Sequence, residues 1–250
     1  MAKISKRILL MTSPKAPIGK SPLHYGDFRP PLGLGFLAAA LRKAGHEALI
    51  VDNYIQENNI PVILKDFRPD FIGIYVHSAS YKQALVLIDA LKRLVSVPII
   101  VGGPHASLMP ESFPDSVDYV VIGEGEKALI ELVEGRLKNR IIQGNRFSSF
   151  ELEGLNWPDY QDLYDKPYNW KLDIFHLKQK RVFSMNTSRG CPFYCNFCGV
   201  ARVSGRGYRV FSAGKIVNEI QRLKEKFDID GIYFREDNFT ASRKRLREFC

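Results

Sequence analysis

Short apolar runs alternate with amphipathic segments over the first 145 residues of the chain. The runs, which have the length and composition of buried strands, are residues 7–11, 47–52, 71–76, 97–103, 118–123 and 140–144. The segments between them, in which apolar residues recur at helical spacing, are 32–45, 60–67, 80–94 and 125–135. Continuous apolar strands separated by amphipathic helices predict a mostly parallel sheet that is covered on both faces.

The clearest of these helices starts at Ser80, whose hydroxyl is expected to cap it. Its apolar face is made of Ala84, Leu87, Ile88, Leu91 and Leu94. Together with the strands on either side, this pattern predicts an α/β fold with a Rossmann-like, doubly wound parallel sheet. Ligands of such sheets bind at the carboxyl ends of the strands.

Glycine-rich loops leave three of the predicted strand ends, at residues 30–35, 101–107 and 123–126. Glycine lets the backbone approach a flat or phosphate-bearing ligand closely. Each loop alone is equally explained as a tight turn between strand and helix, and none fits a dinucleotide fingerprint with its acidic partner. Three such loops at one rim predict a ligand site.

The periodic pattern stops after residue 145. Residues 146–180 are rich in Trp, Tyr and Pro and show no helical or strand period, which predicts an ordered connector packed against both sides. A second unit then begins with a strand at 181–188 and continues with a helix from Ser212 and a strand at 231–237. The apolar face of that helix is expected to be Ile216, Val217, Ile220, Leu223 and Phe227. We therefore predict a first domain at 1–145, a connector at 146–180 and a second domain at 181–250.

The net charge of +9 is concentrated at one end of the chain. Residues 1–175 hold 20 Lys and Arg against 20 Asp and Glu, whereas residues 176–250 hold 16 against 7. One interpretation is nucleic-acid binding. The favoured one is a basic segment around an anionic cofactor or thiolate cluster, because no basic strip interleaved with aromatic residues is visible.

No segment has the roughly 20 apolar residues that span a bilayer, and nothing resembles a signal peptide. A cytoplasmic protein is therefore expected, and disulfides are rare in that compartment. Three of the four cysteines, Cys191, Cys195 and Cys198, lie within eight residues on one loop after a strand. They indicate a metal or redox site. A structural zinc site needs four ligands, and His176 and Cys250 complete no recognisable zinc pair. An iron–sulfur cluster held by three cysteines has one iron open to bind a substrate.

The segment CPFYCNFC (191–198) resembles the CxxxCxΦC motif of the radical S-adenosylmethionine (SAM) enzymes, with Phe197 at the aromatic position. The resemblance implies that the three cysteines hold a [4Fe–4S] cluster and that SAM binds its open iron. Reductive cleavage of SAM then yields a 5′-deoxyadenosyl radical, with no protein side chain taking a catalytic part beyond the cluster ligands. Phe197 is implied to pack beside the adenine.

The segment REDNF (235–239) resembles the (D/E)DNFT sequence of one branch of that family. The residues implied to meet the SAM ribose or amino group are Glu236, Asp237 and Asn238. No GGE-like sequence follows the second strand. The alternative interpretation is that Glu236 and Asp237 end a strand in solvent.

The segments at 29–47, 102–107 and 118–126 resemble the cobalamin-binding domain that precedes the radical SAM barrel in a large subgroup. The residues implied to contact cobalamin are Leu32, Gly33, Ser78, Ala79, Ser80, Gly102, Gly103, Pro104, His105, Gly123, Glu124, Gly125 and Glu126. The DxHxxG signature is absent and His24 does not fit it, so no protein imidazole is expected on cobalt. For His105 and His77, capping of backbone is favoured over cobalt ligation.

A radical SAM barrel has about six strand–helix units of roughly 30 residues each. The 75 residues from His176 onward provide two strands and the start of a second helix. We therefore expect an amino-terminal part with a truncated barrel, in which Cys250 is an ordinary helix residue.

The predicted function is that of a cobalamin-dependent radical SAM enzyme, with methyl transfer to an unactivated carbon as the leading reaction. The alternatives are cyclisation or rearrangement, RNA modification, and a non-catalytic module that binds cobalamin or a cluster. The expected partners are a small-molecule substrate and an external electron donor of the flavodoxin or ferredoxin type, with nucleic acid not favoured.

Overall fold

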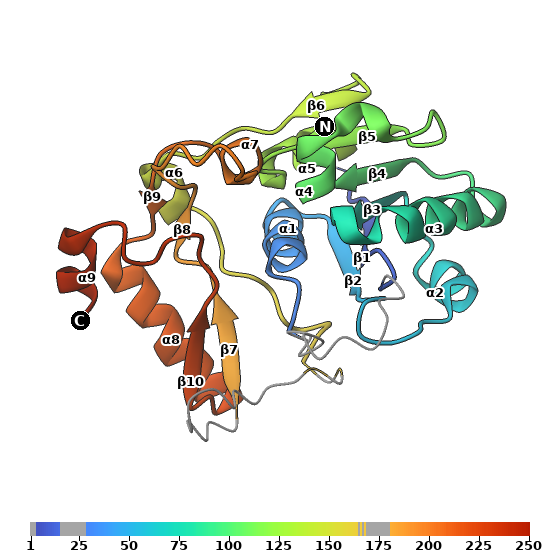
Figure 1. The fold of residues 1–250 in the computed structure, drawn as a ribbon. Coiled ribbons are helices and arrows are strands. Elements are labelled where there is room, and N and C mark those ends of the chain that lie inside the picture. Colours follow the sequence, from blue (N-terminus) through green and yellow to red (C-terminus); the bar gives the residue numbers. More distant parts are fainter. Residues whose placement is uncertain (1–3, 16–28, 165, 167, 169–180) are drawn as a thin grey trace, which may run out of the picture.

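The computed structural model describes residues 4–15, 29–164, 166, 168 and 181–250 (Figure 1). Its largest feature is a six-stranded parallel sheet in the order β2-β1-β3-β4-β5-β6. The strands are β1 (Arg7–Thr12), β2 (Glu47–Val51), β3 (Phe71–Tyr75), β4 (Ile99–Gly102), β5 (Tyr119–Ile122) and β6 (Ile141–Gln143). The strand order reverses between β1 and β3, which creates a crevice at their carboxyl ends.

Helices cover both faces of this sheet, as Figure 1 shows. They are α1 (Leu32–Lys43), α2 (Ile60–Phe67), α3 (Tyr81–Leu94), α4 (Pro104–Leu108) and α5 (Glu126–Val133). Helices α1 and α5 share one buried apolar cluster with the sheet, and α2, α3 and α4 share the other. Neighbouring residues of β1 belong to different clusters, Leu10 to the first and Leu9 to the second, because side chains of a strand alternate between its faces. The expected Rossmann-like α/β fold is confirmed.

The start of α3 differs from the expectation. Ser80 precedes the helix, but its hydroxyl makes no capping hydrogen bond and instead pairs with the hydroxyl of Ser13 at 2.6 Å. A short 3₁₀ turn (Ser78–Ser80) provides the entry to the helix. Leu94, expected on the apolar face, is 50% exposed because it lies at the last turn, beyond the edge of the sheet core.

The segment after β6 contains a helix that the sequence pattern did not predict, α6 (Ser149–Glu153). It is stabilised at its start by a capping box, in which Ser148 and Glu151 exchange hydrogen bonds with each other's backbone. The connector buries Leu152 and Tyr160 with the second part of the chain, and Leu163 and Tyr168 with the sheet. Residues 165, 167 and 169–180 of the predicted connector lie outside the described residues, as does His176.

The second part of the chain pairs β7 (Val182–Met185) with β10 (Gly231–Phe234) in parallel. A small antiparallel pair, β8 (Ser188–Arg189) with β9 (Arg209–Val210), flanks the cysteine loop. The helices are α7 (Val200–Val203), α8 (Ala213–Phe227) and α9 (Arg243–Phe249). The hydroxyl of Ser212 caps α8 as expected, whereas Val217 is 39% exposed and lies at the margin of the apolar face.

Helix α1 joins the two parts. Its residues Leu34 and Ala38 pack on the six-stranded sheet, whereas Leu32 and Phe36 belong to the core that β7 and α8 build. The ring of Phe36 stacks on that of Phe211 with 6.4 Å between centroids. Within the described ranges, no helix is both long and apolar enough to cross a membrane.

Candidate functional site

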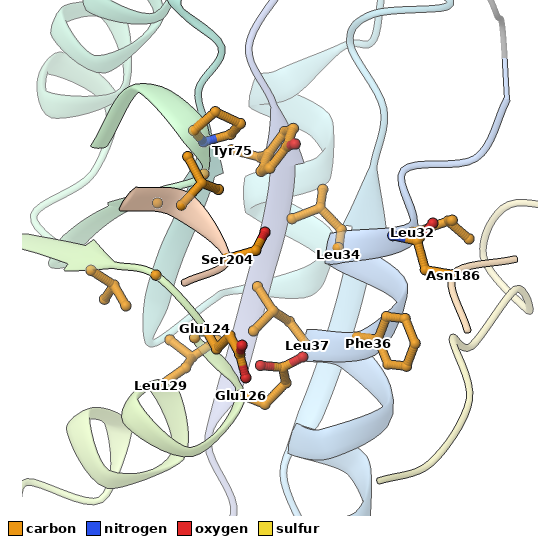
Figure 2. A pocket seen from close by; sticks show the side chains of 18 of the residues that line it. Leu32, Leu34, Phe36, Leu37, Tyr75, Glu124, Glu126, Leu129, Asn186 and Ser204 are labelled. Carbon is orange, nitrogen blue, oxygen red and sulfur yellow. The ribbon is translucent and has the colours of Figure 1, made fainter. Parts of the chain in front are cut away.

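A cavity of about 290 Å³ lies where the carboxyl ends of the six-stranded sheet meet those of β7 and β10 (Figure 2). From the sheet side it is lined by residues of α1, β3, β4 and the β5–α5 loop, several of which Figure 2 labels. From the other side it is lined by Asn186, Ser188, Arg189, Val203, Ser204, Arg235, Glu236 and Asp237. The cavity therefore occupies the crevice at the strand-order reversal, which is where open α/β sheets bind ligands.

The room in this cavity depends on missing side chains. Gly103 has φ +95°, and a Cβ on it would lie 2.7 Å from Cδ2 of Tyr75, so no other residue fits there without displacing the tyrosine ring. Tyr75 is partly buried at the end of β3, and burial raises the pKa of its hydroxyl. Gly103 therefore lets the ring of Tyr75 pack against the turn between β4 and α4 in the cavity wall.

Most of the predicted glycine-rich contacts line the cavity. They are Leu32, Gly33, Gly102, Gly103, Pro104, Gly123, Glu124, Gly125 and Glu126, joined from the second part by Glu236 and Asp237. The remaining predicted contacts, Ser78, Ala79, Ser80, His105, Phe197 and Asn238, are not among its lining residues.

Both ring nitrogens of His105 are occupied. Nδ1 lies 3.0 Å from the hydroxyl of Ser78 and Nε2 lies 3.1 Å from the hydroxyl of Ser112, while the ring stacks on Tyr81. Burial lowers the pKa of His105, which favours the neutral imidazole. The expected capping of backbone is therefore wrong for this side chain, because its partners are hydroxyl groups.

His77 packs edge-on against Tyr75 with 4.7 Å between ring centroids. Partial burial lowers the pKa of His77, and the charge of Arg235 acts in the same direction. His24 lies outside the described residues.

The carboxylates of the β5–α5 loop are engaged by two arginines. Glu126 pairs with Arg189 at 2.5 Å, and Glu124 pairs with Arg209 at 2.5 Å and with Arg189 at 3.3 Å. Burial works against the charge of Arg189, but Glu126 and then Glu124 outweigh it and raise the pKa of the guanidinium. These two glutamates line the cavity, yet their charge is compensated within the protein.

The cysteine loop follows this arginine directly. Cys191 is partly buried, whereas Cys195 and Cys198 are exposed, and none forms a disulfide. In the part of the chain that the structure describes, no three His, Cys, Asp or Glu side chains are grouped so that they hold a metal ion. Three free thiols on one loop are nevertheless the donor set that an iron–sulfur cluster takes, and Phe197 is 93% exposed beside them.

Glu236 does not end its strand in solvent. Its side chain is fully buried and accepts hydrogen bonds from the backbone N of Thr187 at 2.6 Å and from the hydroxyls of Thr187 and Ser188. Arg245 of α9 pairs with it at 3.3 Å. Partial burial raises the pKa of the neighbouring Asp237, and the charge of Glu236 adds to this effect.

Sequence reasoning missed several residues of the cavity wall, among them Tyr75, Asn186, Arg189 and Arg235. Asn186 follows β7, and its buried Oδ1 has no hydrogen-bond partner among the described residues. Its only sequence signal is its place at a predicted strand end. Arg189 was detectable as a charged residue two positions before the first cysteine of the motif.

The family model described as the B12 binding domain matches residues 24–133. An uncharacterised methyltransferase of Pyrococcus horikoshii is 28% identical over 97% of the chain and 56% of the relative. The hopanoid C-3 methylase of Methylococcus capsulatus is 30% identical over 82% of the chain and 42% of the relative. An anaerobic magnesium-protoporphyrin IX monomethyl ester cyclase of Cereibacter sphaeroides is 27% identical over 88% of the chain and 39% of the relative.

Two solved structures show the same fold. The cobalamin-dependent SAM radical enzyme OxsB, with aqua-cobalamin and SAM bound, superposes with a TM-score of 0.74 at 20% identity over 98% of this chain and 36% of that one. The radical SAM methyltransferase TsrM from Kitasatospora setae gives 0.69 at 20% identity over 98% of this chain and 50% of that one. The chain spans between 39% and 56% of the length of the sequence relatives named above.

Proposed function

We propose, from the premise that this chain carries a B12 binding domain and has the fold of cobalamin-dependent radical SAM enzymes, that it belongs to an enzyme that methylates an unactivated carbon. The observation that carries this proposal is the cavity. Its wall combines glycine-rich loops of the matched domain with the strand ends that lead into the three-cysteine loop.

The residues present suit the cofactors of such an enzyme. Cys191, Cys195 and Cys198 supply three free thiols for a [4Fe–4S] cluster, which leaves one iron to bind SAM. When bound, these groups would supply the 5′-deoxyadenosyl radical, and cobalamin would supply the methyl group.

The chain's own residues would shape the cavity and orient the bound cofactor. The wall formed by Gly103, Tyr75 and the apolar side chains of α1 would face a bound macrocycle and exclude water from it. The amide of Asn186 would hydrogen-bond a polar group of the bound cofactor, because a buried amide oxygen without a partner is costly.

The proposal extends to organisation and partners. We take residues 1–145 as the cobalamin-binding domain, 146–180 as the connector and 181–250 as the start of the radical SAM barrel. A small-molecule substrate and a reducing protein of the flavodoxin or ferredoxin type complete the reaction.

A ring-forming reaction is the second candidate. It is favoured by the similarity to an anaerobic magnesium-protoporphyrin IX monomethyl ester cyclase over 88% of the chain. The two reactions differ in the product, since methylation adds a carbon that originates in SAM. Transfer of label from methyl-labelled SAM to the product therefore separates them.

The test is anaerobic reconstitution with iron, sulfide and hydroxocobalamin, followed by optical and EPR spectra with and without SAM. We expect a cluster whose EPR signal shifts when SAM is added, together with retained corrin absorbance. Cys191→Ala, Cys195→Ala and Cys198→Ala should each lose the cluster, whereas Cys250→Ala, on the exposed end of α9, should keep it. A colourless protein that holds one zinc ion would contradict the proposal.

A further inference from the structure

A closed group of four charges lies in the cavity wall between the β5–α5 loop and the β8–β9 pair. Arg189 and Arg209 are opposite each other across the two short strands. Both guanidinium groups reach Glu124, at 3.3 Å and 2.5 Å, and Arg189 also reaches Glu126 at 2.5 Å. Two positive and two negative charges therefore compensate one another.

This group is shielded from water. The side chains of Arg189 and Arg209 are 13% and 14% exposed, and those of Glu124 and Glu126 are 6% and 7% exposed. The guanidinium of Arg189 also lies over two rings, 5.0 Å from the centroid of Phe36 and 5.7 Å from that of Phe147. Low exposure keeps the attraction between these charges strong, because little solvent screens it.

The group is connected to the first cysteine by a single residue. Gly190 has φ +78°, and a Cβ there would lie 2.7 Å from the carbonyl oxygen of Gly205. The backbone of Cys191 then forms a bridge with Arg206. Because Gly190 joins the two residues directly, in a backbone conformation that favours glycine, a movement of Arg189 would be passed on to the first cysteine.

Three of the four side chains also line the cavity and face whatever fills it. Glu124, Glu126 and Arg189 are all lining residues, and so are Gly123 and Gly125 on the same loop. An occupant that contacts the β5–α5 loop therefore contacts the carboxylates that hold Arg189. A shift of the β5–α5 loop would change these ion pairs. Arg189, which takes part in them, leads directly into the cysteine loop.

We propose that Arg189 is a positioning residue that couples the occupant of the cavity to the geometry of the cysteine loop through Glu124 and Glu126. The occupant is of the corrin class, and in this respect the inference rests on the proposed function. Binding in the cavity restricts the β5–α5 loop, and Arg189 passes this restriction to Cys191. Occupation of the cavity thus prepares the first cysteine for its ligand.

The experiment measures alkylation of each thiol of the intact, metal-free chain by mass spectrometry, with and without cyanocobalamin. Cyanocobalamin is used because its cyanide ligand resists exchange with thiols. The variants are Arg189→Met, which keeps the length of the side chain, Arg189→Lys, and Glu126→Gln. The control is Arg202→Met, since Arg202 is exposed on α7 in the same part of the chain. Cys250 is an internal reference thiol.

In the wild-type chain, cyanocobalamin is expected to slow alkylation of Cys191 about fivefold or more, which is in the usual range of coupling between sites, and to leave Cys250 unchanged. Arg202→Met should behave as wild type. At cyanocobalamin concentrations that saturate each variant, whatever its affinity, Arg189→Met and Glu126→Gln should show equal rates with and without the corrin, while Arg189→Lys should recover part of the difference. If Arg189 only stabilised the fold, Arg189→Met would speed the alkylation of every thiol. It would not selectively remove the difference between the rates of Cys191 alkylation with and without cyanocobalamin.

Two results overturn the inference and are distinguishable. If the wild-type chain retains cyanocobalamin but Cys191 reacts at the same rate in its presence, Arg189 does not couple the sites and the proposed function stands. If the wild-type chain retains no corrin, both the coupling role of Arg189 and the proposed function are contradicted. A folded Arg189→Met variant with wild-type coupling would also contradict the assignment, and circular dichroism establishes that it is folded.

Discussion

The rim of the six-stranded sheet, made of the residues after β3, β4 and β5, presents mainly glycines and apolar side chains to the cavity. Its two carboxylates, Glu124 and Glu126, are paired with arginines of the second part. The rim of the second part, made of the residues after β7 and β10, presents hydroxyl and charged side chains that bond to one another. The first rim makes room by lacking side chains, and the second fixes loops through buried ion pairs. One rim is therefore suited to receive a flat ligand, and the other to hold reactive groups in place.

This contrast predicts which kind of substitution harms each rim. At the first rim, volume added at the glycines should be harmful. At the second rim, loss of one charge should be harmful because its partner remains buried and unpaired.

Removal of one charge at the second rim should have the largest effect on stability. In Arg245→Met, the carboxylate of Glu236 stays buried without its cationic partner, which costs about 3–5 kcal/mol of unfolding free energy. Urea unfolding measures the loss. The matched control is Lys244→Met, since that side chain is 88% exposed, and a similar loss in both variants would contradict the prediction.

Added volume at the first rim should have the next largest effect. Gly103→Ala places a Cβ against Tyr75 in a backbone region that only glycine adopts easily, which costs about 1–3 kcal/mol. It should also weaken corrin binding, measured by equilibrium titration. Gly135→Ala is the control, because its φ is also positive while nothing lies within 4 Å of the added atom. Equal corrin affinity in the two variants would mean that the first rim does not contact the ligand.

A buried histidine beside the first rim should make stability depend on pH. Burial lowers the pKa of His105 in the folded state below the ordinary histidine value of 6.5, so the unfolded chain binds the proton more readily. Stability is therefore full above pH 6.5 and falls as the pH drops below that value towards the folded pKa. The pKa of His77 is lowered too, so His105→Gln should reduce the slope of unfolding free energy against pH and leave part of it. A steeper dependence of unfolding free energy on pH in His105→Gln would contradict the lowered pKa of His105.

Loss of an unpaired amide should have the smallest effect on folding. Asn186→Ala removes a group whose Oδ1 has no partner among the described residues, so the urea midpoint should barely change. Corrin affinity should fall about fivefold to tenfold, the equivalent of one hydrogen bond. Asn156→Ala, an exposed position on the connector, is the control. An unchanged dissociation constant for Asn186→Ala would show that the second rim does not contact the ligand.

The contrast between the rims also shows where sequence reasoning succeeds. The apolar runs and amphipathic segments predicted every strand of the six-stranded sheet. Buried strands and half-buried helices differ in the spacing of apolar residues along the chain, so the sequence alone distinguishes them. The helix α6 was missed because it is one short turn held by a capping box at Ser148 and Glu151, and five residues are too few to show a period.

Charged residues of the site were predicted less well. Glu124, Glu126 and Glu236, which the family resemblance implied as cofactor contacts, line the cavity. Their partners, Arg189, Arg209 and Arg245, lie between 9 and 85 positions away along the chain, and no local pattern pairs a glutamate with one arginine among many. Whether a carboxylate faces a ligand or an arginine depends on these long-range pairings.

By itself, the sequence determined the parallel α/β architecture, the glycine-rich rim and the presence of three thiols on one loop. Those features depend on neighbours along the chain, where periodicity, turn chemistry and motif spacing act. Only the tertiary structure decided that His105 is held by two serines, that Glu236 is internal, and that Arg189 joins the β5–α5 loop to the cysteine loop. Buried polar groups must find partners wherever the fold places them, and this requirement is satisfied in space rather than along the sequence.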